Sequence, residues 1–143
     1  MKNAVGVARV LLVDDDPASR LTLQTVLKAS GYAVDSAASA AEAVNKLDQR
    51  EYELVLSDLG MESPEAGYRV LAHARTMDYR PATAIVTSTY KTSPGGPSLE
   101  REKMLIETED VPGLLGQVAS LIARRASNKI KRQIRLATAA TLG

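Results

Sequence analysis

The chain has 143 residues, of which 45% are hydrophobic and 24% charged, a composition typical of one globular domain rather than of a disordered or collagen-like chain. It contains no cysteine and one histidine, His73, which excludes a disulfide framework, a thiolate nucleophile, a zinc ribbon and a histidine-rich metal site. No stretch reaches the roughly 18–20 uncharged apolar residues of a membrane span and the first residues do not resemble a signal peptide, so the sequence predicts a cytoplasmic protein.

Basic residues concentrate near the C-terminus, although the net charge of the whole chain is only +1. No acidic residue follows Asp110, whereas the segment 124–135 carries six basic residues: Arg124, Arg125, Lys129, Lys131, Arg132 and Arg135. Residues 1–123 hold the remaining 12 basic residues and all 17 acidic ones, a net charge of −5. The chain is therefore an acidic body with a basic tail.

The first elements alternate between strand and helix patterns. Residues 9–13 form a short aliphatic run that predicts a buried strand. Asp16 is a good N-cap and Pro17 a good first residue for the helix that follows, whose apolar positions recur at helical spacing up to Gly31: Leu21, Leu23, Val26 and Leu27. Residues 32–37 then alternate as a second strand.

The alternation continues through the middle of the chain. Ser39 opens an alanine-rich helix, and residues 53–58 predict a third strand that ends in an acid. Residues 64–79 predict a third helix, with Val70, Leu71, Ala74 and Met77 facing inward, and residues 82–87 predict a fourth strand.

The pattern becomes irregular after the fourth strand. Residues 94–97 read Pro-Gly-Gly-Pro, so the helix expected there is shortened or irregular. Residues 103–107 predict a fifth strand, and Pro112 begins a last helix with a clear apolar stripe: Val111, Leu114, Leu115, Val118, Leu121 and Ile122.

Strands that alternate with helices predict an α/β fold, because right-handed βαβ units build a parallel sheet with helices on both faces. Five such units in about 125 residues fit the smaller doubly wound fold, a five-stranded parallel sheet. Ligands of such folds bind at the carboxyl ends of the strands. We therefore expect the chemistry of this chain at those ends.

Polar residues follow three of the predicted strands. Asp14, Asp15 and Asp16 come after the first, Asp58 ends the third, and Thr87 and Ser88 close the fourth. Clustered carboxylates without cysteine or histidine suit magnesium, which prefers hard oxygen ligands. Asp16 is better explained as a helix cap, whereas acids from two distant segments that both fall at strand ends indicate a site.

Three segments resemble the motifs of bacterial response-regulator receiver domains: residues 11–17 (Leu-Leu-Val-Asp-Asp-Asp-Pro), 55–61 (Val-Leu-Ser-Asp-Leu-Gly-Met) and 85–88 (Ile-Val-Thr-Ser). The resemblance covers residues 8–124. It implies a flavodoxin-like, CheY-like fold in three α/β/α layers, and a phosphorelay in which a histidine kinase donates a phosphoryl group to an aspartate in the presence of magnesium.

The resemblance assigns roles to individual positions. Asp58 matches the phosphoacceptor, Asp15 a direct metal ligand, Asp14 an acid that holds the metal through water, and Gly60 a ligand through its backbone carbonyl. Thr87–Ser88 matches the switch segment, whose threonine hydroxyl contacts the phosphoryl group. The implied molecule is a phosphoacceptor signalling domain rather than an enzyme, with at most self-catalysed phosphorylation and dephosphorylation.

The chain departs from the family pattern at three places. Glu107 stands where the family has a lysine, and Met104 where it has an aromatic switch residue. The segment 94–97 interrupts the fourth helix. Lys91 or Lys103 could replace the missing cation. These departures leave open a second hypothesis, a pseudo-receiver that works by protein contacts and is not switched by phosphorylation.

The sequence predicts three segments: an N-terminal segment 1–7, a receiver domain 8–124 and a basic extension 125–143. The extension is a linker or helical continuation in one interpretation and a polybasic patch in the other, for an acidic partner, nucleic acid or a membrane surface. The implied partners are a sensor histidine kinase or phosphotransfer protein and a downstream protein target. A homodimer is allowed, and direct nucleic-acid binding by the receiver itself is not expected.

Overall fold

A five-stranded parallel sheet forms the centre of the protein in the computed structural model, which describes residues 7–58, 63, 65–87, 105–107 and 110–142. The strands are β1 Arg9–Val13, β2 Ala33–Ala37, β3 Leu54–Asp58, β4 Ala82–Thr87 and β5 Leu105–Glu107. Their order across the sheet is β2-β1-β3-β4-β5, and all four neighbouring pairs are parallel. The predicted doubly wound, five-stranded parallel sheet is confirmed.

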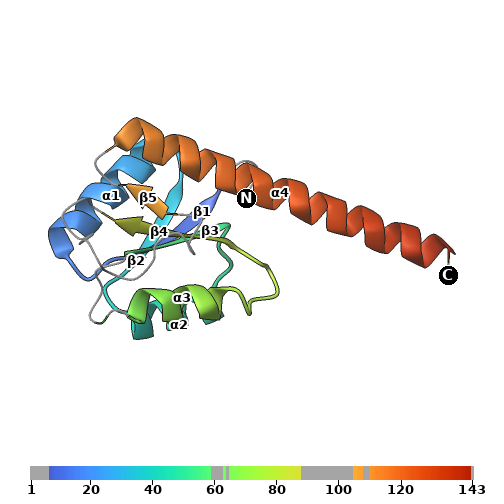
Figure 1. Ribbon diagram of the computed structural model, residues 1–143, viewed down its shortest axis with the longest axis horizontal. Coiled ribbons are helices and arrows are strands. Elements are labelled where there is room, and N and C mark those ends of the chain that lie inside the picture. The colour runs from blue at the N-terminus through green and yellow to red at the C-terminus, as the bar shows by residue number, and fades with distance from the viewer. Residues whose placement is uncertain (1–6, 59–62, 64, 88–104, 108–109, 143) are drawn as a thin grey trace, which may run out of the picture.

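Helices cover both faces of this sheet (Figure 1). The four described helices are α1 Pro17–Ala29, α2 Ala40–Gln49, α3 Ala66–Ala74 and α4 Val111–Leu142. α1 and α4 lie on one face, and α2 and α3 lie on the other (Figure 1). The shortened helix expected between β4 and β5 falls on residues that lie outside the described part of the chain.

Alternation along the strands divides the core into two layers. In β1, Leu11 and Val13 face the layer under α2 and α3, whereas Val10 and Leu12 face the layer under α1 and α4, and all four are fully buried. A strand that is buried on both faces has a nearly continuous run of aliphatic residues in its sequence, which explains why residues 9–13 do not alternate between polar and apolar. Tyr52 is an aromatic side chain of the first layer, and its hydroxyl donates to the Asp35 carboxylate at 2.8 Å.

Side-chain caps fix where two of the helices begin. The Asp16 carboxylate accepts from the Ser19 amide at 2.9 Å, with Pro17 in the first turn, as predicted. Ser39 caps α2 by accepting from the Glu42 amide at 3.1 Å, and the Glu42 carboxylate accepts from the Ala38 amide at 2.8 Å. The two bonds resemble a capping box, with the Glu42 carboxylate on the amide before the cap residue, and they fix the turn between β2 and α2.

Two details of the predicted helices are wrong. Leu21 is 65% exposed, because Leu23 and Leu27 define the buried face of α1 and Leu21 lies about 200° around the helix from Leu23. α3 is also shorter than the segment 64–79. It ends at Ala74, and the chain passes through tight turns to Arg80, whose φ of 46° is left-handed.

α4 runs far beyond the sheet. Its first half packs on β4 and β5 through Leu114, Val118 and Leu121, and its second half projects away from the body (Figure 1). α4 continues through the basic tail as far as Leu142, and along it Ile130 and Ile134 are 56% and 60% exposed. Among the described helices, none combines the length and apolar character that crossing a bilayer requires.

Gly67 lets α3 approach the end of β3 closely. A Cβ atom at this position would lie 2.8 Å from the Asp58 carbonyl oxygen and 3.2 Å from the Ser57 hydroxyl oxygen. The first distance is too short for a real contact, and backbone at Asp58 cannot move aside as a flexible side chain can. Gly67 therefore fixes the separation between α3 and the carboxyl end of β3.

We expect Gly67→Ala to lower the free energy of unfolding by about 1–3 kcal/mol, because the added methyl group overpacks this contact. Urea denaturation of the variant measures the loss. Gly116→Ala is the matched control, since Gly116 is exposed on α4 with open space at its Cβ position, and alanine there should stabilise the helix slightly. Equal stability of the two variants would contradict the close approach at Gly67.

Candidate functional site

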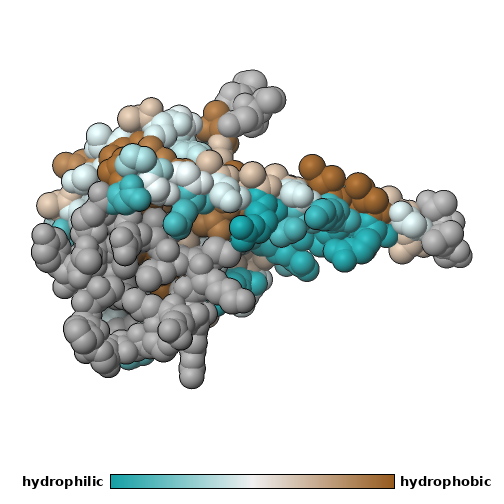
Figure 2. All heavy atoms as spheres, turned by 45° about the horizontal axis from the view of Figure 1, so that its top comes forward, coloured by the Kyte–Doolittle hydropathy of each residue, from teal (hydrophilic) through white to brown (hydrophobic). Residues whose placement is uncertain are grey.

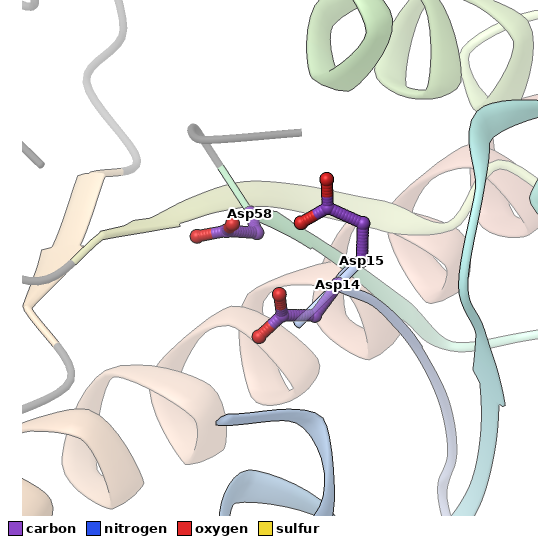
Figure 3. Close-up of side chains that lie close together, drawn as sticks. All are labelled: Asp14, Asp15 and Asp58. Atoms are coloured by element: carbon purple, nitrogen blue, oxygen red, sulfur yellow. The ribbon is translucent and has the colours of Figure 1, made fainter. Parts of the chain in front are cut away.

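Three aspartates gather at the carboxyl ends of β1 and β3. Asp14 and Asp15 directly follow β1, and Asp58 is the last residue of β3. The two strands are neighbours in register, with Val13 opposite Ser57, so the sheet itself brings these residues together. One carboxylate oxygen from each aspartate lies within 4.8 Å of those of the others (Figure 3). We call these three residues the acidic cluster.

The acidic cluster is largely removed from solvent. Asp14 is fully buried, Asp58 is 3% exposed and Asp15 is half-buried. Two carboxylates about 4–5 Å apart repel each other by about 3–4 kcal/mol at an effective dielectric constant of 20. Burial of three such groups together therefore favours a cation between them.

Backbone contacts hold Asp14 in place. Its amide donates to the Ala37 carbonyl at 3.0 Å, and its own carbonyl accepts from Arg20 Nη1 at 2.8 Å. One carboxylate oxygen, Oδ1, accepts from the Asp16 amide at 3.0 Å. The other, Oδ2, is buried, and within the described part of the chain it has no hydrogen-bond partner. A buried acceptor of this kind needs a ligand or a water molecule.

The donor set fits a small, hard divalent cation. All three groups are carboxylates, one of them carries an unpaired buried oxygen, and the rim at Asp15 is open to solvent. Mg²⁺ binds through one or two carboxylates and keeps several of its waters, so a half-open cluster suits it better than a closed cage would.

The other predicted site residues fall at the same edge of the sheet or outside the described residues. Thr87 ends β4 and Glu107 ends β5, and the two are Cα partners across this strand pair. The backbone thus places the last residues of β1, β3, β4 and β5 along one edge. Gly60, Ser88 and Met104 lie outside the described part of the chain, as do Lys91 and Lys103.

The structure adds two residues to the surroundings of the site. Arg20 holds the Asp14 carbonyl, and Gly67 sets the position of the Asp58 backbone. Each left a weak signal in the sequence, since Arg20 is a cation in the first turn after the acidic run and Gly67 is a glycine inside a helical pattern. Neither signal distinguishes a contact with the site from an ordinary surface position.

Comparison with known proteins identifies one family. The family model described as response regulator receiver domain matches residues 10–96, which is more than half of the chain. The gliding motility regulatory protein of Myxococcus xanthus is 38% identical over 76 residues, 53% of this chain and 9% of that protein. The two-component response regulator ARR11 of Arabidopsis thaliana is 39% identical over 67 residues, 46% of this chain and 13% of that protein. The chain therefore spans only about a tenth of the length of these relatives.

Solved structures of similar fold cover most of the chain. The response regulator receiver domain protein (CheY-like) from Methanospirillum hungatei superposes with a TM-score of 0.71 at 24% identity, covering 86% of this chain and 99% of that one. Response regulator protein TrrA from Thermotoga maritima, solved in complex with Mg(2+)-BeF, has a TM-score of 0.64 at 26% identity and covers 80% and 99%. The first likeness concerns the fold alone.

Proposed function

This chain belongs to the response regulator receiver family of two-component signalling, and we propose that it accepts a phosphoryl group on the carboxylate of Asp58. One observation carries the proposal: Asp14, Asp15 and Asp58 converge from two strand ends to within 4.8 Å, with two of them buried. The donor would be a sensor histidine kinase or a phosphotransfer protein. Incubation with acetyl phosphate and Mg²⁺, followed by intact-mass measurement, tests whether one phosphoryl group is added.

The transfer itself is a simple exchange of bonds. An oxygen of the Asp58 carboxylate attacks phosphorus, a P–O bond forms, and the P–N bond of the donor phosphohistidine breaks, its electron pair returning to the imidazole. Positioning and electrostatics supply most of the catalysis in such transfers. Asp58 is suited to this role because the end of β3 and the contact with Gly67 fix its backbone.

Mg²⁺ would be held by the acidic cluster. The carboxylates of Asp15 and Asp58 would bind it directly, Asp14 through a water molecule, and the Gly60 carbonyl would complete the protein ligands, as the family resemblance implies. Bound there, the ion would offset the negative charge of the nucleophile and of the phosphoryl oxygens. The intact acidic cluster supports this function over the pseudo-receiver hypothesis.

The residues at the ends of β4 and β5 would affect phosphorylation in opposite ways. We propose that the Thr87 hydroxyl contacts the phosphoryl group, with Ser88 beside it in the switch segment. Glu107 would bring a carboxylate where the family uses an ammonium group. The register that pairs Thr87 with Glu107 supports this assignment, because it puts both backbones at the edge where Asp58 lies.

We expect Glu107→Lys to increase the rate or extent of phosphorylation by acetyl phosphate about tenfold or more. A carboxylate near the phosphoryl oxygens costs about 1–4 kcal/mol at 4 Å, and an ammonium group gains a comparable amount. Phosphorylation and decay are measured separately by intact mass. Glu51→Lys, the same charge change before β3 at the other end of the sheet, is the control. Unchanged formation and decay rates in Glu107→Lys would contradict the placement of Glu107.

We also propose that residues 8–124 act as the receiver and residues 125–143 as a basic extension. Core side chains of α4 as far as Leu121 support the first boundary. Arg125, the first residue of the extension, nevertheless contacts the receiver part, because its guanidinium group donates to the carbonyls of Tyr79 and Arg80 at 2.7 and 3.0 Å. The downstream protein target, the homodimer, the cytoplasmic location and the role of Met104 stay predictions.

A further inference from the structure

A groove of about 950 Å³ lies between α4 and the turn that leads from α3 into β4. Its walls carry eight basic residues: Arg75 and Arg80 come from the turn, and the other six are the basic residues of the segment 124–135 of α4. None of the described residues that line it is acidic. We call this feature the basic groove.

Contacts between its walls form the basic groove in advance of any ligand. Arg125 donates from Nε to the Arg80 carbonyl at 3.0 Å and from Nη2 to the Tyr79 carbonyl at 2.7 Å, which joins α4 to the turn. The Tyr79 hydroxyl donates to the Leu47 carbonyl at 2.9 Å and anchors the turn on α2. Burial raises the pKa of Tyr79 to about 12, so this side chain adds no negative charge to the groove at neutral pH.

The basic groove lies at the end of the sheet opposite the acidic cluster. Arg80 precedes β4, which begins at Ala82, whereas Asp58 ends the neighbouring parallel strand β3. The three aspartates therefore cannot neutralise these cations at short range. α4 offers no acid either, because its described residues include none, and like charges three or four residues apart on a helix repel each other.

The six basic residues of α4 share one broad side of the helix, since all of them line the groove. From 124 to 135 the helix rises about 16 Å, and this stretch reaches into the half of the helix that projects from the body (Figure 1). Figure 2 shows hydrophilic side chains on one side of the projecting helix and hydrophobic ones on another. Ala126, Ile130 and Ile134 belong to the uncharged side.

We propose that the basic groove and the adjoining side of α4 bind the phosphate backbone of duplex DNA. Six of the eight cations are arginines, whose planar guanidinium groups match phosphate oxygens. The span of about 16 Å that the basic residues cover along α4 is long enough to reach several phosphates, because each strand of B-form DNA has one phosphate for about every 3.4 Å of the duplex axis. An exposed projecting helix also fits the wide major groove of B-form DNA, and not the deep, narrow one of A-form RNA.

Other polyanions fit the groove less well. A flat membrane cannot enter a concave groove between a helix and a turn. A single strand needs aromatic side chains for base stacking, and Tyr79, the aromatic residue in the lining, has its hydroxyl bonded to α2. An acidic peptide needs apolar anchors, and the lining supplies few beyond Leu121 and Pro81. This site is inferred from the groove and α4 alone, without assuming phosphorylation at Asp58.

Titration of the full-length protein with a labelled 24-base-pair duplex DNA at several salt concentrations tests the proposal. If about six phosphates are contacted, the logarithm of the association constant should fall with the logarithm of salt concentration with a slope of about −5. Lys129→Gln combined with Lys131→Gln should reduce this slope by about 2 and weaken binding about tenfold at moderate salt. Helical CD of the variant verifies that α4 is retained.

The matched control removes two lysines that lie off the groove, Lys28 on α1 and Lys46 on α2, by the same change to glutamine. This control should bind duplex DNA as the parent does. Equal weakening by both double variants, or no binding at 50 mM salt, would overturn the site. Tighter binding to duplex RNA of the same length, to polyglutamate or to vesicles with anionic phosphatidylglycerol would overturn the assignment of duplex DNA as the ligand.

Discussion

Replacement of Asp58 by asparagine is expected to abolish the uptake of a phosphoryl group from acetyl phosphate. The amide is close to the carboxylate in size but is a far weaker nucleophile, so the P–O bond cannot form at a useful rate. Intact-mass measurement should show one added phosphoryl group on the parent protein and none on Asp58→Asn. Because Asp58 ends a buried strand in close contact with α3, urea denaturation should first establish that the variant is folded.

Asp78→Asn is the control for this result. Asp78 is an exposed aspartate in the turn between α3 and β4, at the end of the sheet opposite the acidic cluster, and the same change there should leave phosphorylation unaffected. If Asp58→Asn were phosphorylated as readily as the parent, another carboxylate would be the acceptor. Asp15 would then be the first candidate, since its carboxylate belongs to the same cluster and is more exposed.

Asp15→Asn should weaken Mg²⁺ binding at least tenfold. The change removes one of three clustered negative charges and leaves a neutral amide where the proposed ligand has a carboxylate. Calorimetric titration with Mg²⁺, or the rise of the melting temperature with Mg²⁺ concentration, measures the effect. Without Mg²⁺ the same variant should be as stable as the parent or more stable, because the remaining carboxylates repel each other less.

Asp16→Asn separates a local effect from a general loss of charge. Asp16 neighbours Asp15 in the sequence, but its exposed carboxylate caps α1 by accepting from the Ser19 amide. Asparagine is an equally good N-cap, so this variant should fold normally. We expect its Mg²⁺ affinity to stay within about twofold of the parent value. A loss as large as that of Asp15→Asn would show that net charge, and not ligation by Asp15, governs the affinity.

Much of the arrangement at the carboxyl edge of the sheet could be predicted because its signals are local. The aliphatic runs that end at Val13 and Asp58 mark strand ends, and the parallel topology alone then requires these ends to lie along one edge. The N-cap at Asp16 could also be predicted from the sequence, since it depends on a hydrogen bond to the amide three residues later. Asp14 and Asp58 thus came together in the structure as their positions in the sequence predicted.

What could not be predicted depends on contacts between distant segments. The length of α3 follows from the turn to Arg80, and the carbonyls of this turn are held by Arg125, some 45 residues later in the chain. Leu21 satisfied helical spacing, yet the sheet buries only the face defined by Leu23 and Leu27. Periodicity shows that a helix has an apolar stripe, but the packing decides which residues of that stripe are covered.

The length of α4 makes it a lever arm. Its 32 residues extend about 48 Å, and among its described side chains the buried ones, Leu114, Val118 and Leu121, all lie in the part nearest the sheet. A tilt of about 5° at Arg125, whose hydrogen bonds hold α4 to the turn, would displace the tip of the helix, about 26 Å away, by about 2 Å. Sub-ångström shifts of β4 and β5, the strands that end at Thr87 and Glu107, would therefore be magnified mechanically at the far end of α4.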